Sequence, residues 1–539
     1  IYVVSRICGE GNDRSFDKGD FRLNDAEIRD ILKLNHEAKR FLLVLNVGGP
    51  IDLSEVKEVK NILLLSQLGV DTATALAYIL LGKSNPSGKL TTTWARMEDY
   101  SNVGTFGDRN DSDYKEGIYV GYRYFDSAAI EPLFPFGFGL SYTEFEIDYL
   151  KTEIEKDIVK VKTLVRNTGA YAGKEAVQLY VSLPDGKLDK AYQELSAFRK
   201  TGNILPEEKE ETELRFSLKS LASYDTQRQA YVLEKGDYIL RLGNSSRNTR
   251  VVNVLTLKED IIVRQVKNCF AGCGFTDHVF KRTLKDDLTD VEHMFIDPKS
   301  FVSETIEYRD DYPINEKVEK LSDEQLAYLN TGAFNEKGGI ASVIGSASTS
   351  VAGAAGESSS KSGLKPLVMA DGPAGLRISP LYYEDKKGIH SYGPSIPLTV
   401  VEFLPKIVQF FLGGTPRRKK GIVLKEQYTT AIPIGTAIAQ SFNEELSEIC
   451  GDIVGKEMEI FNIDLWLAPA LNIHRHVLCG RNFEYFSEDP LISGKLAGAI
   501  TRAVQKHPGK AVTIKHYAVN NQETNRYNTS SNVSERALR

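Results

Sequence analysis

The 539-residue chain is long enough for about three or four domains, and its 41% hydrophobic content excludes a disordered or fibrous protein. Its 67 basic and 73 acidic residues leave a net charge of −6, which argues against a nucleic-acid partner, and it has no apolar run of the about 18 residues that span a membrane. Its five cysteines exclude a disulfide scaffold and favour a reducing compartment, so we expect a cytoplasmic protein.

Residues 1–142 alternate short apolar strands with helical segments, a pattern typical of a parallel α/β sheet. Strands are predicted at residues 1–4, 41–47 and 61–65. Helices are predicted at residues 25–40 and 72–81, the first capped by Asn24 with Glu27 as its N3 acid. These strands are too few for a whole domain, and residue 1 is Ile within a strand. We therefore expect an interior fragment whose N-terminus is missing.

The hydrophobic period changes to two in residues 143–256, where Val159, Val161 and Val165 alternate with Lys160, Lys162 and Leu164. Short strands separated by turn residues over this length predict a β-sandwich of immunoglobulin or fibronectin type III shape. Residues 257–320 are charged and irregular, so we interpret them as a linker. Cys269 and Cys273 in it are interpreted as free thiols, because no matching Cys/His pair follows.

Residues 321–539 return to an α/β pattern, which begins with a capping box of Ser322 and Gln325 and contains a small-residue loop at 348–362. Apolar strands are predicted at residues 366–370, 464–468 and 511–514. Helices are predicted at residues 443–461 and about 490–506. An insert at about 379–430 holds an apolar stretch at 396–412 and a basic run at 417–420. This stretch fits a helix packed on the domain, with a membrane-touching or partner-binding helix as the alternative.

Polar clusters follow each of these three strands, at residues 371–377, 472–485 and 515–526. Polar residues at strand C-termini form the site of a (β/α)8 barrel, and these Asp, Arg, Lys, His and Asn side chains suit the hydroxyls of a sugar. The sequence offers no Ser–His–Asp grouping and no phosphate-binding loop. A second candidate is the loop at 5–14, where Gly9 and Gly11 bracket Glu10 and leave its carboxyl projecting.

These motifs, with those at 82–90, 121–125, 134–142 and 167–181, make the whole chain resemble glycoside hydrolase family 3, in the β-glucosidase branch with inverted domain order. The resemblance implies a multidomain α/β plus all-β fold. Residues 1–142 would be the C-terminal half of the family's α/β sandwich domain, and residues 143–256 a fibronectin type III-like β-sandwich. After the linker at 257–320, residues 321–539 would be the first part of the (β/α)8 barrel, which comes first in the usual order.

The resemblance also implies roles for single residues. Glu10 would be the catalytic acid/base, reaching the barrel mouth from the neighbouring domain. The substrate-binding residues would be Asp371, Arg377, Arg481, Lys515, His516 and Arg526. The family nucleophile is an Asp on a later barrel strand, which has no counterpart in this chain, so we expect the chain alone to be inactive. We expect burial against the sugar and the charge of the nucleophile to raise the pKa of Glu10.

The expected function is that of a retaining exo-β-glucosidase acting on terminal β-D-glucosyl residues of a β-glucoside or cello-oligosaccharide, with no metal and no organic cofactor. One alternative is a β-xylosidase or α-L-arabinofuranosidase of the same family. The other is a carbohydrate-binding protein without catalysis. A homo-oligomer is left open.

Overall fold

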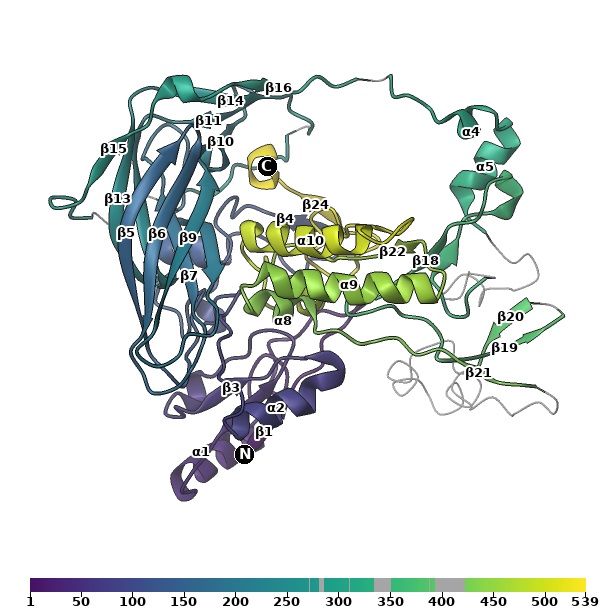
Figure 1. Cartoon of the computed structure of the whole chain (residues 1–539), viewed down its shortest axis with the longest axis horizontal. Helices are drawn as coiled ribbons and strands as arrows, with labels where there is room; N and C mark the ends of the chain where they lie inside the picture. The colour runs from purple at the N-terminus through teal and green to yellow at the C-terminus, as the bar shows by residue number, and fades with distance from the viewer. Residues whose placement is uncertain (271, 281–285, 310, 334–349, 387, 393–421) are drawn as a thin grey trace.

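The computed structural model describes residues 1–539 except 271, 281–285, 310, 334–349, 387 and 393–421. The expected insert helix at 396–412, the basic run at 417–420 and the start of the loop at 348–362 lie outside the described residues. Figure 1 shows the β-sandwich standing beside two other units, with the N-terminal unit below and the C-terminal helices α9 and α10 in the middle.

The N-terminal unit (residues 1–142) has the predicted parallel sheet, of order β1-β2-β3. Its strands are β1 (Tyr2–Ser5), β2 (Leu43–Asn46) and β3 (Ile62–Leu64). Its helices are α1 (Asp25–Glu37), α2 (Thr72–Leu80) and α3 (Tyr122–Ser127). The Asn24 side chain accepts from the Glu27 N–H and the Glu27 carboxylate accepts from the Asn24 N–H, so the predicted capping box is confirmed.

The sandwich packs a three-stranded sheet against a five-stranded sheet. The first sheet holds β5 (Phe145–Glu155), β6 (Ile158–Asn167) and β9 (Lys209–Ser217). The second has the order β15-β13-β12-β7-β8, with β7 (Ala176–Ser182), β8 (Glu194–Lys200), β12 (Gly236–Ser245), β13 (Asn248–Leu257) and β15 (His293–Phe295). Val159, Val161 and Val165 are buried between the sheets, as their alternation predicts.

The expected linker at 257–320 differs from the structure, because three short strands in it extend the sandwich. β15 pairs in parallel with β13, and β14 (Ile261–Gln265) and β16 (Glu304–Thr305) complete a sheet with β10 (Ser223–Asp225) and β11 (Ala230–Leu233). These strands are two to five residues long, which is too short for a periodicity to mark them. Each pairs with a strand from another segment: β15 with β13, β14 with β11 and β16 with β14. The residues that follow include α4 (Glu316–Glu319).

The C-terminal unit (residues 321–539) contains the three predicted strands as parallel neighbours, β18 (Val368–Ala370), β22 (Leu465–Trp466) and β23 (Ala511–Val512). β17 (Gly356–Glu357) joins that sheet antiparallel to β18. The helices are α5 (Asp323–Thr331), α8 (Gly435–Gln440), α9 (Glu444–Ile460), α10 (Pro490–Gln505) and α11 (Glu535–Leu538). The described part of the insert forms β19 (Leu381–Asp385), β20 (Gly388–Ser391) and β21 (Lys425–Glu426).

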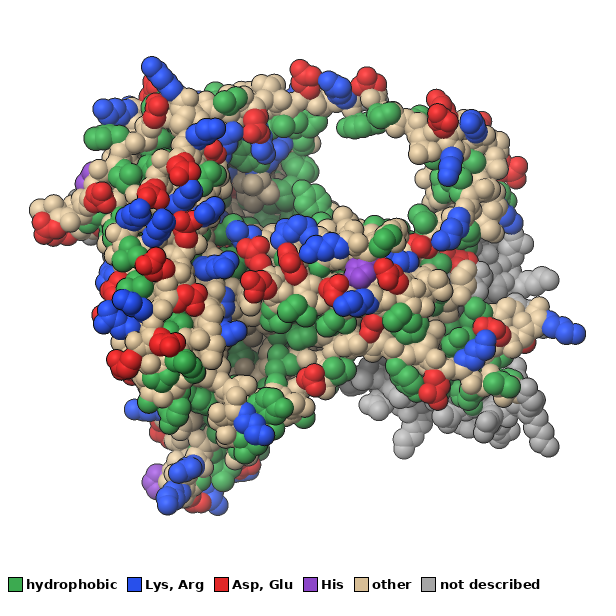
Figure 2. Space-filling model, viewed as in Figure 1, with side chains coloured by type: hydrophobic (Ala, Val, Ile, Leu, Met, Phe, Trp, Pro, Cys, Tyr) green, Lys and Arg blue, Asp and Glu red, His purple; other side chains and the backbone are tan. Residues whose placement is uncertain are grey.

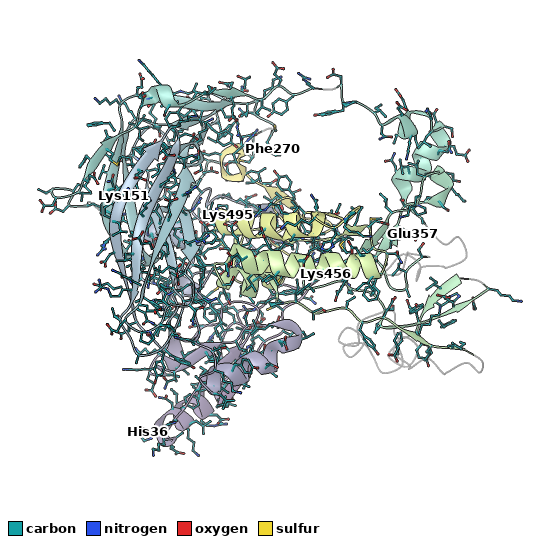
Figure 3. The ribbon with its side chains drawn as sticks, in the orientation of Figure 1. His36, Lys151, Phe270, Glu357, Lys456 and Lys495 are labelled. Carbon is teal, nitrogen blue, oxygen red and sulfur yellow. The ribbon has the colours of Figure 1, made fainter. Side chains whose placement is uncertain are left out.

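The units share contacts that fix their relative positions. One apolar core includes Tyr122 of α3, Tyr180 of β7 and Trp466 of β22, one residue from each unit. Lys495 of α10 lies 5.8 Å from the ring centroid of Phe198 in β8, where the helix meets the sandwich (Figure 3). β24 (Ser530–Asn532) pairs in parallel with β4 (Asp111–Asp113) across the boundary between the terminal units. The N-terminal and C-terminal units are therefore packed against each other and against the sandwich.

Charged side chains of both signs are interspersed over the face seen in Figure 2, in keeping with the small net charge of −6. Within the described residues, no helix combines the length and the apolar character needed to cross a bilayer.

Candidate active site

The loop after β1 presents Glu10 above the ends of the strands of the C-terminal unit. The backbone turns at Gly11, whose φ of +95° suits glycine, and Gly9 and Asn12 form an isolated bridge across the turn. Arg6 forms an ion pair with Glu27 at 2.7 Å, and Arg14 donates to the carbonyl oxygen of Pro50 at 2.6 Å. Both ends of the loop are therefore anchored in the N-terminal unit, while Glu10 projects from it.

The other face of this loop touches the C-terminal unit closely. A Cβ atom at Gly480 would lie 1.9 Å from the carbonyl oxygen of Asn12, so only glycine allows this approach. The Arg14 N–H donates to the Leu478 carbonyl oxygen at 2.8 Å. Asp13 accepts hydrogen bonds from the N–H groups of Gly480 at 3.1 Å and Glu523 at 2.9 Å. The loop is thus attached to the chain following β22 and to the chain following β23.

Glu10 faces two arginines of the C-terminal unit. Arg526 Nη2 donates to Glu10 Oε1 at 2.8 Å, and Arg481 Nη1 lies 3.7 Å from the same oxygen. The Glu10 side chain is 48% exposed. Partial burial acts to raise the pKa of Glu10, but the two guanidinium groups outweigh it, and the pKa is lowered. The expected rise in the pKa of Glu10 concerns the carboxyl buried against the sugar and beside the nucleophile, and it stays a prediction; in this structure Arg481 and Arg526 stabilise the ionised carboxylate.

Asp371 stands at the end of β18 with a cation on each oxygen. Lys515 Nζ lies 2.5 Å from Oδ1, and Arg377 Nη2 lies 2.5 Å from Oδ2. A tight turn brings Arg377 back to Asp371, since Gly372 and Gly375 both adopt positive φ and the Arg377 N–H donates to the Asp371 carbonyl oxygen at 2.8 Å. Burial opposes ionisation, yet the two cations lower the pKa of Asp371. The turn at these glycines thus places the Arg377 guanidinium beside the Asp371 carboxylate.

Arg481 and His516 line the buried side of the same site. Arg481 forms a buried ion pair with Glu484, and burial raises the pKa of that carboxyl against the pull of Arg481. His516 Nδ1 lies 3.1 Å from the Tyr485 hydroxyl, and the Asn472 side chain accepts from the His516 N–H at 2.9 Å. Burial, with Arg481 and Lys515 nearby, lowers the pKa of His516 to about 4, so the imidazole is neutral at pH 7.

The structure brings all seven predicted site residues together. Six follow the ends of the three parallel strands β18, β22 and β23, and Glu10 comes from the loop after β1. Asp371 lies close enough to Glu10 to oppose its ionisation, and Lys515 lies close enough to Glu484 to favour the ionisation of that carboxyl. The site therefore combines one projecting carboxyl with fixed cations and a buried carboxylate. Charged and polar groups of this kind can bind sugar hydroxyls in defined positions.

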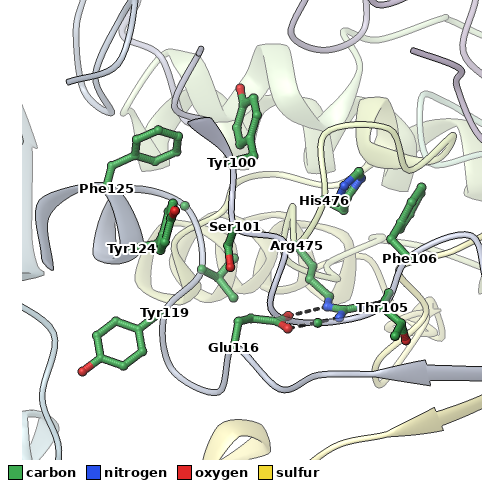
Figure 4. A pocket seen from close by; sticks show the side chains of 13 residues that line it. Tyr100, Ser101, Thr105, Phe106, Glu116, Tyr119, Tyr124, Phe125, Arg475 and His476 are labelled. Carbon is green, nitrogen blue, oxygen red and sulfur yellow. Dashed lines mark hydrogen bonds and ion pairs between the residues drawn. The ribbon is translucent and has the colours of Figure 1, made fainter. Parts of the chain in front are cut away.

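Two other residues of the polar cluster after β22 take part in the contact between the terminal units instead. Arg475 forms an ion pair with Glu116 beside a small pocket with several aromatic side chains (Figure 4). The Arg475 guanidinium also lies 3.7 Å from the ring centroid of Tyr114. His474 Nδ1 lies 2.6 Å from the Thr92 hydroxyl oxygen, and burial lowers the pKa of His474 to about 4. These residues attach the C-terminal unit to the segment 92–116.

Sequence reasoning missed three acidic residues that organise the site, namely Asp13, Glu484 and Glu523. Each lies within one of the motifs described above, but a single sequence shows neither the burial nor the partner of an acidic side chain. Glu523 is 2% exposed, and its carboxylate accepts from Arg526 Nη1 at 2.7 Å and from the Gly11 N–H at 2.8 Å. The one available signal was spacing, since Glu484 and Glu523 each stand three positions from a predicted arginine.

Comparisons with known domains agree with this arrangement. Residues 1–142 match the model of the glycosyl hydrolase family 3 C-terminal domain, and residues 175–246 match that of the fibronectin type III-like domain. Residues 417–537 match that of the glycosyl hydrolase family 3 N terminal domain. The domains therefore occur in the inverted order that the motifs predict.

Two curated relatives and one solved structure are similar over the whole chain. Beta-glucosidase A of Butyrivibrio fibrisolvens is 33% identical over 100% of this chain and 69% of its own length. A beta-glucosidase of Ruminococcus albus is 32% identical over 100% of this chain and 54% of its own. The crystal structure of a beta-glucosidase from Paenibacillus barengoltzii superposes with a TM-score of 0.75 at 30% identity, covering 99% of this chain and 58% of that one.

The domain composition and the fold are those of a glycoside hydrolase. The chain belongs to glycoside hydrolase family 3, since its family domains match in sequence and a relative matches along the whole chain. The chain spans 54% to 69% of the length of the two relatives described.

Proposed function

We propose that this chain carries the acid/base and the sugar-binding residues of a retaining exo-β-glucosidase. The observation that carries the proposal is the position of Glu10, whose carboxyl from the N-terminal unit lies 2.8 Å from Arg526 in the C-terminal unit. A carboxyl above a cluster of hydroxyl-binding charges is the arrangement that protonation of a glycosidic oxygen requires.

Asp371, Lys515 and Arg377 form the part of the site that we assign to the sugar hydroxyls. A carboxylate held between two cations can accept from two neighbouring hydroxyls, while Lys515 and Arg377 donate to their oxygens. We assign Asp371 to the O4 and O6 hydroxyls of a terminal glucosyl residue. This assignment favours a glucoside over a pentoside, because a xylosyl residue has no O6.

Glu10 has to be protonated to cleave the first bond. In this structure Arg481 and Arg526 lower the pKa of Glu10, so the Michaelis complex has to weaken at least one of these contacts. A glucosyl group over Arg481 and Arg526 would turn their N–H groups toward its hydroxyls and bury the carboxyl further. Both effects would raise the pKa of Glu10 toward the value that a general acid needs.

A retaining mechanism needs a second carboxylate about 5–5.5 Å from the first. The described carboxylates nearest to Glu10 are engaged by cations, namely Asp371 by Lys515, Glu484 by Arg481 and Glu523 by Arg526. We propose that the nucleophile is an Asp on a later barrel strand, outside residues 1–539. This agrees with the relatives, which are longer than this chain. The 539-residue chain alone is then expected to release no aglycone.

The test is turnover of 4-nitrophenyl β-D-glucoside by the enzyme that includes the proposed nucleophile, wild type against Glu10→Gln. We expect the variant to lose about 10²- to 10⁴-fold in rate, and added azide to restore part of it with β-glucosyl azide as the product. An unchanged rate would move the acid/base to another residue. A panel of nitrophenyl glycosides separates the glucosidase from a xylosidase or arabinofuranosidase, and sugar binding without any turnover would favour a binding protein.

A further inference from the structure

We propose that Glu523 is a positioning residue for Glu10, which it controls by fixing the backbone of the Glu10 loop and by sharing the Arg526 guanidinium with it. The inference rests on the proposed role of Glu10 as acid/base. Glu523 lies in the C-terminal unit and Glu10 in the N-terminal unit, so the proposal assigns a catalytic consequence to the contact between the two units.

Glu523 holds the loop directly beside the acid/base. Its Oε2 atom accepts from the N–H of Gly11, the residue that follows Glu10, at 2.8 Å. Gly11 is the turn residue with positive φ, so this bond fixes the point at which the backbone reverses. The Glu523 side chain has no exposed surface, and a hydrogen bond to a buried carboxylate is stronger than one between neutral groups. A shift of the Gly11 N–H would therefore move the Glu10 carboxyl with it.

Asp13 makes the reverse connection. It lies in the Glu10 loop and accepts from the backbone N–H of Glu523 at 2.9 Å and of Thr524 at 2.8 Å, and from the Thr524 hydroxyl at 2.8 Å. Each of the two facing segments thus supplies one carboxylate to the backbone amides of the other. This reciprocal pair, which we call the carboxylate clasp (Asp13 and Glu523), determines the spacing between the segments.

Arg526 connects the clasp to the acid/base. Its Nη1 atom donates to Glu523 Oε2 at 2.7 Å and its Nη2 atom to Glu10 Oε1 at 2.8 Å, so one guanidinium serves two carboxylates. Glu10 also faces Arg481 and Asp371, and it acts on the ionisation of Glu484 and His516. The charged groups that face Glu523 are Arg526, Arg481 and Asp13.

Burial raises the pKa of Glu523 against the pull of the Gly11 N–H, Arg526 and Arg481. In its ionised form, Glu523 would oppose the ionisation of Glu10 in two ways: it would repel the Glu10 carboxylate, and it would occupy one side of the guanidinium that stabilises that carboxylate. The other carboxylate oxygen of Glu523, Oε1, is buried and has no hydrogen-bond partner among the described residues. The ion pair of the Glu523 carboxylate is therefore the one that Arg526 makes with Oε2. With Glu523 neutralised, Arg526 would form its ion pair with Glu10 alone, and the pKa of Glu10 would fall.

Two substitutions separate the parts of this role. Glu523→Gln keeps an oxygen that can accept from the Gly11 N–H but removes the charge. Glu523→Ala removes both the charge and the acceptor. Glu234→Gln is the matched control, because Glu234 is also a buried carboxylate that accepts a backbone N–H, from Lys187 at 2.7 Å, and pairs with a cation, Lys190, but it lies in the sandwich.

The first measurement is the titration of Glu10 in the 539-residue chain, followed by NMR of ¹³C-labelled glutamate carboxyls and assigned with Glu10→Gln. We expect Glu10 to titrate at lower pH in Glu523→Gln than in wild type, and at its wild-type pH in Glu234→Gln. This readout does not require turnover. An unchanged titration of Glu10 in Glu523→Gln overturns the charge-sharing part of the proposal, whether or not the proposed function is correct.

The second measurement compares leaving groups in the enzyme that includes the nucleophile. Cellobiose needs protonation of its leaving group, whereas 2,4-dinitrophenyl β-glucoside does not. We expect Glu523→Ala to lower kcat/KM for cellobiose about 10- to 100-fold more than for the dinitrophenyl substrate. We expect the alkaline limb of the Glu523→Gln pH profile to move to lower pH. Equal losses on both substrates, as expected for Glu234→Gln, would reduce Glu523 to a structural residue and overturn the positioning role. Absence of turnover in the wild type would instead refute the proposed function.

Discussion

Glu10 and Arg526 stand 516 positions apart in the chain and are joined by a hydrogen bond of 2.8 Å. The bond crosses the boundary between the N-terminal and C-terminal units, with the whole sandwich between them in sequence. The proton affinity of the proposed acid/base is therefore a property of how the two units dock, since the loop that carries Glu10 contains neither of the arginines that lower its pKa.

Removing the Arg526 charge should have the opposite effect to removing that of Glu523. In Arg526→Gln the pKa of Glu10 should rise, because partial burial would then be opposed by Arg481 alone. The alkaline limb of the kcat/KM profile for 4-nitrophenyl β-glucoside should move to higher pH, and KM should increase. Arg502→Gln, at an exposed arginine of α10, is the control. A limb that moves to lower pH would contradict the assigned electrostatics.

Asp371→Asn should reduce activity toward glucosides more than toward xylosides. The variant loses the charge that holds Lys515 and Arg377, and with it the charge-assisted bonds to hydroxyls. We expect kcat/KM for 4-nitrophenyl β-glucoside to fall about 100-fold or more, and for the β-xyloside by less, because xylose lacks the C6 hydroxyl. Asp452→Asn on the surface of α9 serves as the comparison. Equal losses for both sugars would argue against the assignment to O6.

His474 should make stability depend on pH. Burial lowers the pKa of His474 to about 4, from an unfolded value near 6.5, so between these values the unfolded chain binds more protons. Its contribution is complete above pH 6.5 and is lost as pH falls toward 4, at up to about 1.4 kcal/mol per pH unit. Urea unfolding of His474→Asn between pH 4.5 and 7.5 should show a flatter dependence than wild type. His36→Asn, at an exposed residue of α1, should keep the wild-type slope.

Gly480→Ala should disturb the site without touching any charged residue. The new methyl group would overlap the Asn12 carbonyl oxygen, so the Glu10 loop has to move. We expect a loss of about 1–3 kcal/mol in the free energy of unfolding and about 10- to 100-fold in kcat/KM. Gly494→Ala in α10, where a Cβ atom meets nothing within 4 Å, should instead stabilise the protein by about 0.4–1 kcal/mol. Wild-type behaviour of Gly480→Ala would mean that the loop tolerates displacement.

The elements that sequence patterns predicted well are those with local signals. The capping boxes of α1 and α5 and the three apolar strands of the C-terminal unit all appear in the structure. The residues assigned to the site come from the family resemblance, whose motifs place six of them after the ends of parallel strands, and their roles stay predictions.

The features that sequence could not supply depend on partners far along the chain. β15 and β16 are strands of three and two residues, and they pair with the edges of β13 and β14. Arg475 follows β22 within a site motif, yet it turns to Glu116 of the N-terminal unit. The direction of the Glu10 pKa shift likewise follows from two arginines more than 400 positions away, which no local pattern reports.

The attachment of Glu10 to residues near position 523 also governs when the site can form during synthesis. At about 5–20 residues per second, a ribosome needs roughly half a minute to two minutes to pass from Glu10 to Arg526. Throughout that interval the Gly11 N–H and the Asp13 carboxylate lack their partners, although the sheet of β1, β2 and β3 can already form. In the nascent chain the surroundings of Glu10, the proposed proton donor, are therefore incomplete until Glu523 and Arg526 emerge.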